Sequence, residues 1–208
     1  DYAHGHQIQS ITRRLLAQKN PDIQIVGDVL HPIGRVKDFA PYVAQIRASG
    51  ADSVITGNWG NDLSLLVRAA ADAGLNVRFY TYYGGGLGGP KAIGAAGEGR
   101  LYQITEYHRN LPLEKNKPEV YDFVLPFDEA NGDVDWYYGR VGTMMDMFKL
   151  AAEKAKSIDP VKVAYALEDL EMETPYGPVV MRGIDHQLLQ PLFISGFTKD
   201  VKYDAENS

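Results

Sequence analysis

The chain has 208 residues and a net charge of −6, with 45% hydrophobic and 23% charged residues and no cysteine. This composition is typical of a folded globular protein with a sizeable core, and it excludes a disordered or disulfide-stapled chain. Nucleic-acid binding is not expected, because the 21 basic residues are scattered among 27 acidic ones and form no basic stripe.

Helical and strand patterns alternate over the first half of the chain. Apolar residues at helical spacing predict a first helix that ends at Asn20-Pro21, and residues 23–29 then predict a strand. The same order continues with a helix near 39–49, a strand at 52–56, a helix near 63–74, a strand at 77–83, a short helix near 91–96 and a strand at 100–106. The alternation predicts an α/β fold, a doubly wound and mostly parallel sheet with helices on its faces.

Beyond residue 107 the pattern changes and helices dominate. One helix is predicted over residues 134–156 and another over 160–170, where Asp159-Pro160 supplies an N-cap and a first-turn proline. Two strand candidates at 177–182 and 192–197, joined by a polar turn, end the pattern.

Aromatic residues follow the carboxyl ends of the predicted strands, where ligands bind in open parallel sheets. Trp59 follows one strand with Asn58 beside it, Tyr82 and Tyr83 end the next strand, and Tyr2 stands at the start of the chain. Aromatic walls with a few hydroxyl and amide groups predict a pocket that holds a small molecule without reacting with it. The alternative interpretation is that Tyr82 and Tyr83 are packed strand-end core residues.

No pattern in the chain predicts catalysis, a metal or a cofactor. The loop Gly84-x-Gly86-x-x-Gly89 formally matches a dinucleotide fingerprint, but the helix after it spans about two turns at most. His4 and His6 point to different sides of a helix, and hydrolase and zinc-protease motifs are missing. Asp62 and Glu106 are carboxylates that spacing alone does not pair. We therefore expect a protein that is not an enzyme and binds no metal and no cofactor.

Five short motifs carry a resemblance to a known family. They are Asp1-Tyr2-Ala3-His4-Gly5, Asp38-Phe39-Ala40-Pro41-Tyr42, Ser49-Gly50-Ala51-Asp52-Ser53-Val54, Ala73-Gly74-Leu75 and Thr174-Pro175-Tyr176-Gly177-Pro178-Val179. In this order and spacing they resemble the C-terminal part of the type I periplasmic solute-binding proteins of branched-chain amino acid ABC transporters. The resemblance implies two α/β lobes that close about a hinge on a small solute, which a membrane permease then receives.

The resemblance also implies a division of the chain and a location in the periplasm. Residues 1–106 would form the second lobe, 107–175 a return segment whose helices pack on the first lobe, and 176–208 the closing strands and tail. The first lobe's opening strands would precede Asp1. We therefore expect either that missing lobe or a second copy to cover the apolar helix face around Trp136 to Phe148.

Tyr2, Trp59 and Tyr83 match ligand-contacting positions of the family. At the position of Tyr83, relatives that hold amino acids carry a carboxylate, which takes the ligand's ammonium. A phenol carries no such charge, so a planar ligand with a carboxylate or amide head is favoured over leucine unless Asp62 supplies the charge. Two other functions stay open: an enzyme on a doubly wound α/β fold, and a ligand-sensing regulatory domain.

Overall fold

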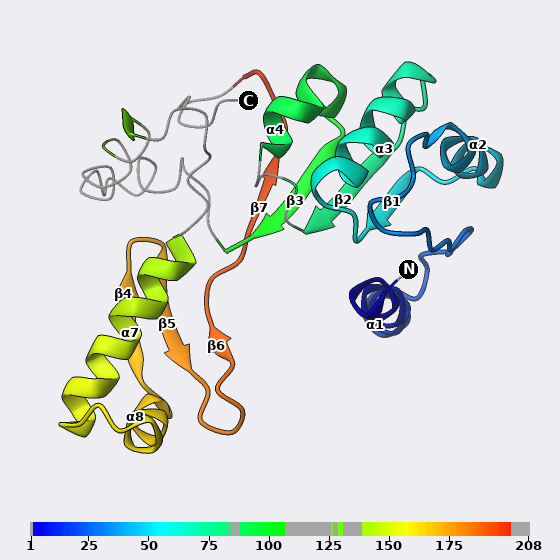
Figure 1. The fold of residues 1–208 in the computed structure, drawn as a ribbon. Coiled ribbons are helices and arrows are strands. Elements are labelled where there is room, and N and C mark those ends of the chain that lie inside the picture. Colours follow the sequence, from blue (N-terminus) through cyan, green and yellow to red (C-terminus); the bar gives the residue numbers. More distant parts are fainter. Residues whose placement is uncertain are drawn as a thin grey trace. The chain divides into compact units, whose positions relative to one another are not determined.

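A computed structural model describes residues 2–82, 84, 88–106, 126, 129–130 and 139–200 of the chain. These residues form two compact units (Figure 1). The first unit holds the described residues up to Ile104 and those from Ile194 onward, and the second holds Thr105 to Phe193. The predicted three-part division of the chain stays a prediction.

A four-stranded sheet forms the centre of the first unit. Its strands, in the order β1-β2-β3-β7, are β1 (Ser53–Thr56), β2 (Arg78–Tyr82), β3 (Leu101–Thr105) and β7 (Phe193–Gly196). β1 pairs with β2, and β2 with β3, in parallel, so that Thr56 lies opposite Thr81 and Tyr82 opposite Ile104. The carboxyl ends of these three strands therefore meet at one edge of the sheet, as the sequence predicts.

Helices of the first unit pack on this sheet through an apolar core, to which the first helix contributes no residue. The helices are α1 (Ala3–Lys19), α2 (Ala40–Ser49), α3 (Gly60–Asp72) and α4 (Gly89–Ile93), followed by the 3-10 helix η1 (Gly94–Gly97). On α3, Leu63, Leu66, Val67 and Ala70 are buried at helical spacing, and they join Phe39, Phe79 and Leu101 in the core. α3 ends as predicted, with Gly74 in the left-handed conformation at φ 64°.

Residues 23–29 form no regular secondary structure and so are not the strand that the sequence predicts. A strand needs a hydrogen-bonding neighbour, and within the described part of the chain no strand is paired with this segment. Its apolar side chains, such as Ile25 and Val29, are 43% and 54% exposed. Asp28 instead ties the segment to α1, because its carboxylate accepts hydrogen bonds from Gln9 Nε2 at 2.7 Å and from Arg13 Nε at 2.6 Å.

The second unit packs two helices on a small antiparallel sheet. The elements are α7 (Gly139–Ala155), α8 (Pro160–Leu167), β4 (Glu171–Thr174), β5 (Gly177–Met181) and β6 (Leu188–Leu189), with β5 in the middle of the sheet. The core contains Met147, Ala151, Ala166, Leu167 and Val179. The predicted N-cap is confirmed, since Asp159 Oδ1 accepts from the Lys162 amide at 3.0 Å.

Three details of this unit differ from the sequence-based expectation. α8 ends at Leu167, three residues before the predicted end, and Asp169 then takes a left-handed conformation at φ 53°. The strands β4 and β6 were not predicted, because each is at most four residues long and carries little periodicity. The two predicted closing strands lie in different sheets, as β5 and β7.

One face of α7 is apolar and open to solvent in this chain. Val141, Met144 and Phe148 are 42%, 47% and 46% exposed. Trp136 and Tyr137, the other residues of the predicted face, lie outside the described residues. What covers this face stays a prediction. Among the helices described, none has the length and apolarity needed to cross a membrane.

The packing of α3 into the apolar core can be tested by substituting two leucines of this helix. Leu63 is 1% exposed and Leu65 is 38% exposed. We expect Leu63→Ala to lower the free energy of unfolding by about 2–5 kcal/mol, because it leaves a cavity, and Leu65→Ala to lower it by less than about 1 kcal/mol. Urea denaturation followed by circular dichroism measures both. Equal losses in the two variants would contradict the assigned core.

The attachment of α1 through Asp28 is expected to depend on pH. The hydrogen bond from Gln9, together with Arg13, lowers the pKa of Asp28 below its usual value. A lowered folded-state pKa stabilises the attachment fully above the ordinary aspartate pKa of about 4, and this contribution is lost as the pH falls through the folded-state pKa. Wild type should therefore be more stable than Asp28→Asn at pH 7, and the difference between their free energies of unfolding should shrink as the pH falls below about 4. Urea denaturation of both proteins across this pH range measures the difference; equal stabilities at pH 7 would refute the assignment.

Candidate functional site

The loop that follows β1 is held by contacts from three directions. The Asn58 amide donates to Thr56 Oγ1 at 3.1 Å, and Thr81 Oγ1 donates to the Asn58 carbonyl at 2.9 Å. The side-chain oxygen of Asn58 lies 2.8 Å from His31 Nε2. These contacts fix both the backbone and the side-chain amide of Asn58. They therefore hold Asn58 and the neighbouring Trp59 at the end of β1.

His31 is a site residue that the sequence-based reasoning missed. Its ring lies edge-on to Phe39, with centroids 5.1 Å apart, and 5.7 Å from the ring of Tyr42. Phe39 is buried at 2% exposure and belongs to the core. The core therefore positions His31, and His31 positions Asn58. No local motif could have revealed this contact, because 27 residues separate His31 from Asn58.

The structure brings Tyr2 and Trp59 together. Trp59 Nε1 donates a hydrogen bond to the Tyr2 hydroxyl at 3.2 Å. Both side chains keep accessible faces, with 38% exposure at Tyr2 and 42% at Trp59. Two amphipathic rings joined in this way form an apolar surface with polar edges, which suits the flat body of a small molecule.

Asp62 is buried in the first turn of α3 and has a structural partner. Its Oδ2 accepts a hydrogen bond from the Gly34 amide at 2.8 Å, and the residue is 7% exposed. A carboxylate in the first helical turn is also stabilised by the helix dipole. Asp62 therefore fixes the loop around Gly34, and its role in balancing a ligand's charge stays a prediction.

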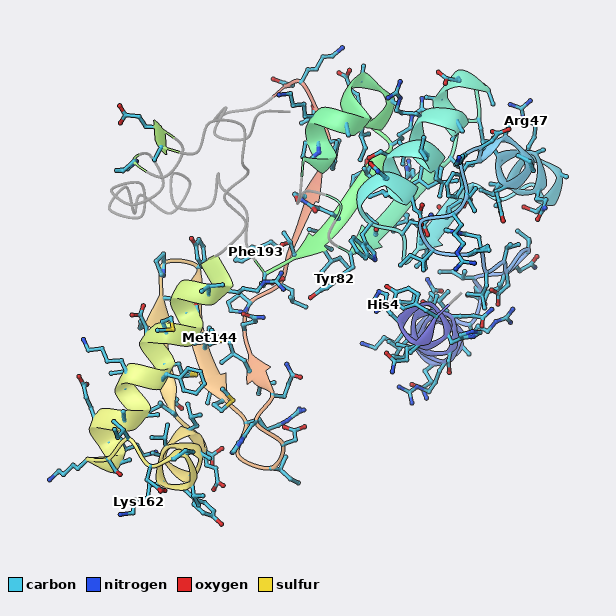
Figure 2. All side chains as sticks on the ribbon, viewed as in Figure 1. His4, Arg47, Tyr82, Met144, Lys162 and Phe193 are labelled. Atoms are coloured by element: carbon cyan, nitrogen blue, oxygen red, sulfur yellow. The ribbon has the colours of Figure 1, made fainter. Side chains whose placement is uncertain are left out.

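Tyr82 is the last residue of β2 (Figure 2). Trp59 follows β1, which ends at the same edge of the sheet. Along β2, Phe79 and Thr81 are buried whereas Tyr80 is 37% exposed, so alternate side chains face the helix-covered core. Tyr82 is partly buried and belongs to neither apolar core of the described residues. Tyr83, the other aromatic residue predicted at this strand end, lies outside the described residues.

The glycine loop leads into a very short helix. α4 spans five residues, Gly89–Ile93, and a Cβ placed on Gly89 would lie 2.4 Å from the Gly84 carbonyl oxygen. Glycine at position 89 therefore serves close backbone packing. Over the described part of the chain, no three His, Cys, Asp or Glu side chains are grouped so that they could hold a metal ion.

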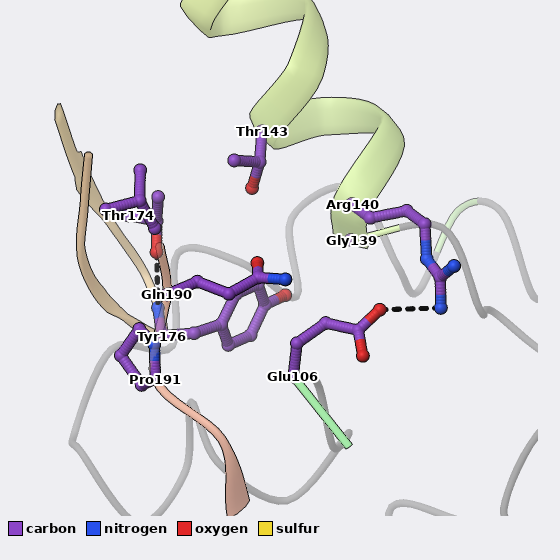
Figure 3. Close-up of a pocket in the computed structure, with 9 residues that line it drawn as sticks. Glu106, Gly139, Arg140, Thr143, Thr174, Tyr176, Gln190 and Pro191 are labelled. Atoms are coloured by element: carbon purple, nitrogen blue, oxygen red, sulfur yellow. Dashed lines mark hydrogen bonds and ion pairs between the residues drawn. The ribbon is translucent and has the colours of Figure 1, made fainter. Parts of the chain in front are cut away.

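A small separate pocket lies within the second unit (Figure 3). Its cavity of about 10 Å³ is lined by Glu106, Gly139, Arg140, Thr143, Thr174, Tyr176, Val179, Gln190 and Pro191. Glu106 forms an ion pair with Arg140 at 2.6 Å. The structure therefore gives Asp62 and Glu106 different partners.

Comparisons with known proteins agree with this fold. The sequence profile of the periplasmic binding protein family matches residues 1–201. A relative from Brucella abortus, the Leu/Ile/Val-binding protein homolog 4, is 32% identical over 193 residues, which are 89% of this chain and 44% of the relative. The chain thus spans less than half the length of that relative.

Two solved structures show the same fold. The leucine-, isoleucine-, valine-, threonine- and alanine-binding protein of Brucella ovis, in its closed conformation, superposes with a TM-score of 0.86 at 28% identity, covering 100% of this chain and 53% of that one. A solute-binding protein of an ABC transporter from Rhodopseudomonas palustris, in complex with p-hydroxybenzoic acid, gives a TM-score of 0.76 at 20% identity, covering 99% and 55%.

The parallel sheet and the helices packed on it define an α/β protein. The chain belongs to the periplasmic binding protein family. Its fold is that of the type I members, which confirms the fold class predicted from the sequence.

The structural role of Asp62 can be tested by hydrogen exchange. We expect Asp62→Ala to release the Gly34 amide, so that its exchange rate in the intact chain rises at least about tenfold, because the loss of a charge-assisted hydrogen bond exceeds about 1.4 kcal/mol. Asp72→Ala, at an exposed position near the end of the same helix, is the matched control. Unchanged exchange at Gly34 in Asp62→Ala would show that the contact contributes nothing.

Proposed function

We propose that this chain is part of an extracytoplasmic solute-binding receptor that captures a small molecule, amino acid-like or an aromatic carboxylate, for an ABC transporter. The observation that carries the proposal is the pair of accessible rings, Tyr2 and Trp59, joined by a hydrogen bond where a parallel strand ends. Open α/β sheets bind their ligands at this edge. Membership in the periplasmic binding protein family supports the same function.

The names of relatives support two solute classes. The relative at 32% identity is named for leucine, isoleucine and valine, whereas fold neighbours at 20% and 17% identity were solved with p-hydroxybenzoic acid and with benzoate. The similarity to these neighbours shows a shared fold and nothing about the solute. The preferred solute is therefore inferred from the residues of this chain. The aromatic rings at Tyr2 and Trp59 favour a planar body, and Tyr83 in place of a carboxylate favours a carboxylate or amide head over an ammonium.

The proposal includes a partner and a location. A receptor of this class delivers its solute to a membrane permease, and it works outside the cytoplasm, in the periplasm of a cell with two membranes. Fold neighbours described as ABC transporter substrate-binding proteins support both parts. We also propose that either the missing first lobe or a second copy of this chain covers the exposed side chains of Met144 and Phe148 on α7.

Trp59→Ala in the full-length protein tests the solute site. We expect it to weaken the binding of the captured solute by about tenfold or more, because stacking on an aromatic ring contributes about 1 kcal/mol beyond its buried area. Calorimetric titration with leucine and with 4-hydroxybenzoate measures the dissociation constants. The matched control is Tyr165→Ala, an aromatic residue that is 69% exposed on α8.

Two outcomes of this titration would count against the proposal. If the full-length protein retains neither solute, the receptor function fails for both classes. If the solute is converted to a product without transporter components, an enzyme is the correct interpretation. Stoichiometric retention of unchanged solute, weakened in Trp59→Ala only, is the expected result.

A further inference from the structure

The second unit carries a group of exposed apolar side chains on and beside α8. Ile158, just before the N-cap Asp159, is 92% exposed, and Ile184, in the turn between β5 and β6, is 90% exposed. On α8 itself, Val161 and Tyr165 are 63% and 69% exposed. These four apolar residues are called the α8 patch below. Single exposed apolar residues are common on protein surfaces, whereas a group of them marks an interaction site.

The turn that carries Ile184 is held against the residues that follow α8. The Gly183 amide donates a hydrogen bond to Asp169 Oδ1 at 3.1 Å, and His186 Nε2 lies 3.8 Å from Glu168 Oε1. Ile184 therefore lies at the carboxyl end of α8. The α8 patch thus extends along the helix from its amino end to this turn.

α8 is apolar on two opposite sides. Ala166 and Leu167 are buried in the core of the second unit, with Val163 packed against that core. Val161 and Tyr165 are four residues apart, so they share the side of the helix that faces away from the core. A helix with one side in water normally carries polar residues on that side. The apolar residues on the outer side of α8 therefore indicate that this side is covered as well.

Charged residues flank the stripe in a self-complementary order. Lys162 is exposed and lies three residues before Tyr165, and Glu168, with a side chain that is 42% exposed, lies three residues after it. Figure 2 shows Lys162 on the side of α8 that points away from β5. In an antiparallel pair of α8 helices centred on Tyr165, Lys162 of each copy lies level with Glu168 of the other. The same pairing sets the end that carries Ile158 against the end that carries Ile184.

We propose that a second copy of this chain covers the α8 patch, in a two-fold symmetric dimer whose α8 helices run antiparallel with Tyr165 at the centre. A two-fold axis requires a self-complementary surface, and the charges and the apolar ends of α8 meet this requirement. A partner with one sign of charge would instead leave Lys162 or Glu168 facing a like charge. This inference goes beyond the proposed function and does not depend on it.

The size of the patch sets the expected affinity. Stable interfaces of standard size have roughly 20–30 residues a side, and the α8 patch has four apolar residues with a few charged neighbours. We therefore expect the full-length protein to exchange between monomer and dimer with a dissociation constant of about 1–100 μM. Sedimentation velocity over concentrations around this value measures the equilibrium.

Charge reversal tests the pairing of the two helices in the full-length protein. Lys162→Glu and Glu168→Lys each place like charges together twice in a dimer, so we expect either variant alone to dimerise at least about tenfold more weakly than wild type. The fold should stay intact, because an acid near the start of a helix and a base near its end are both favoured by the helix dipole. Glu173→Lys, at an exposed position on β4, is the control and should dimerise as wild type does.

An equimolar mixture of the two variants separates a contact between copies from an effect within one copy. A mixed dimer of Lys162→Glu with Glu168→Lys again has opposite charges at both contacts. We therefore expect the mixture to dimerise within about threefold of wild type, although neither variant does so alone. Damage within a single molecule would not be repaired by mixing.

Three results would overturn the inference. A full-length protein that stays monomeric at every concentration would exclude a second copy as the occupant of the α8 patch. Dimerisation that both variants keep unchanged would place the interface on another surface. Weakened variants that do not recover on mixing would exclude the antiparallel pairing. Solute capture is measured separately by calorimetric titration, so none of these results is confused with a failure of the proposed function.

Discussion

Parallel pairing of β1 with β2 and of β2 with β3 is the constraint on which the rest of the structure depends. It sends three strand ends to one edge of the sheet, which is where Trp59 and Tyr82 emerge. It also requires each connection to return across the sheet, and α3 does so by burying an apolar stripe against Phe79 and Leu101. Core packing and the position of the candidate site therefore have one cause.

Two polar side chains near the strand ends, Asp62 and His31, each hold a loop in place. Asp62 holds the Gly34 loop, and His31, wedged against Phe39, holds Asn58. These contacts fix the loops beside Trp59, which would reduce the entropy lost on binding the proposed solute.

The sequence predicts the parallel sheet, the strand-end aromatic residues and the Asp159 cap because each has a local cause: periodicity, a strand end or a capping side chain. It does not predict the contact of His31 with Asn58 or of Glu106 with Arg140, since these pairs are far apart along the chain. The strand predicted at residues 23–29 shows the converse error. The alternation of its side chains suits a strand, but a strand also needs a neighbouring strand to pair with. Periodicity along the sequence does not show whether such a neighbour is present.

A crystal structure of the full-length protein with its retained solute tests the central claim most directly. The measurement is the distance from the solute's heavy atoms to the side chains at the ends of β1 and β2. Our account predicts that the solute lies against the rings of Tyr2 and Trp59, within about 4 Å, the range of van der Waals contact. A solute bound elsewhere, with both rings facing solvent, would contradict it.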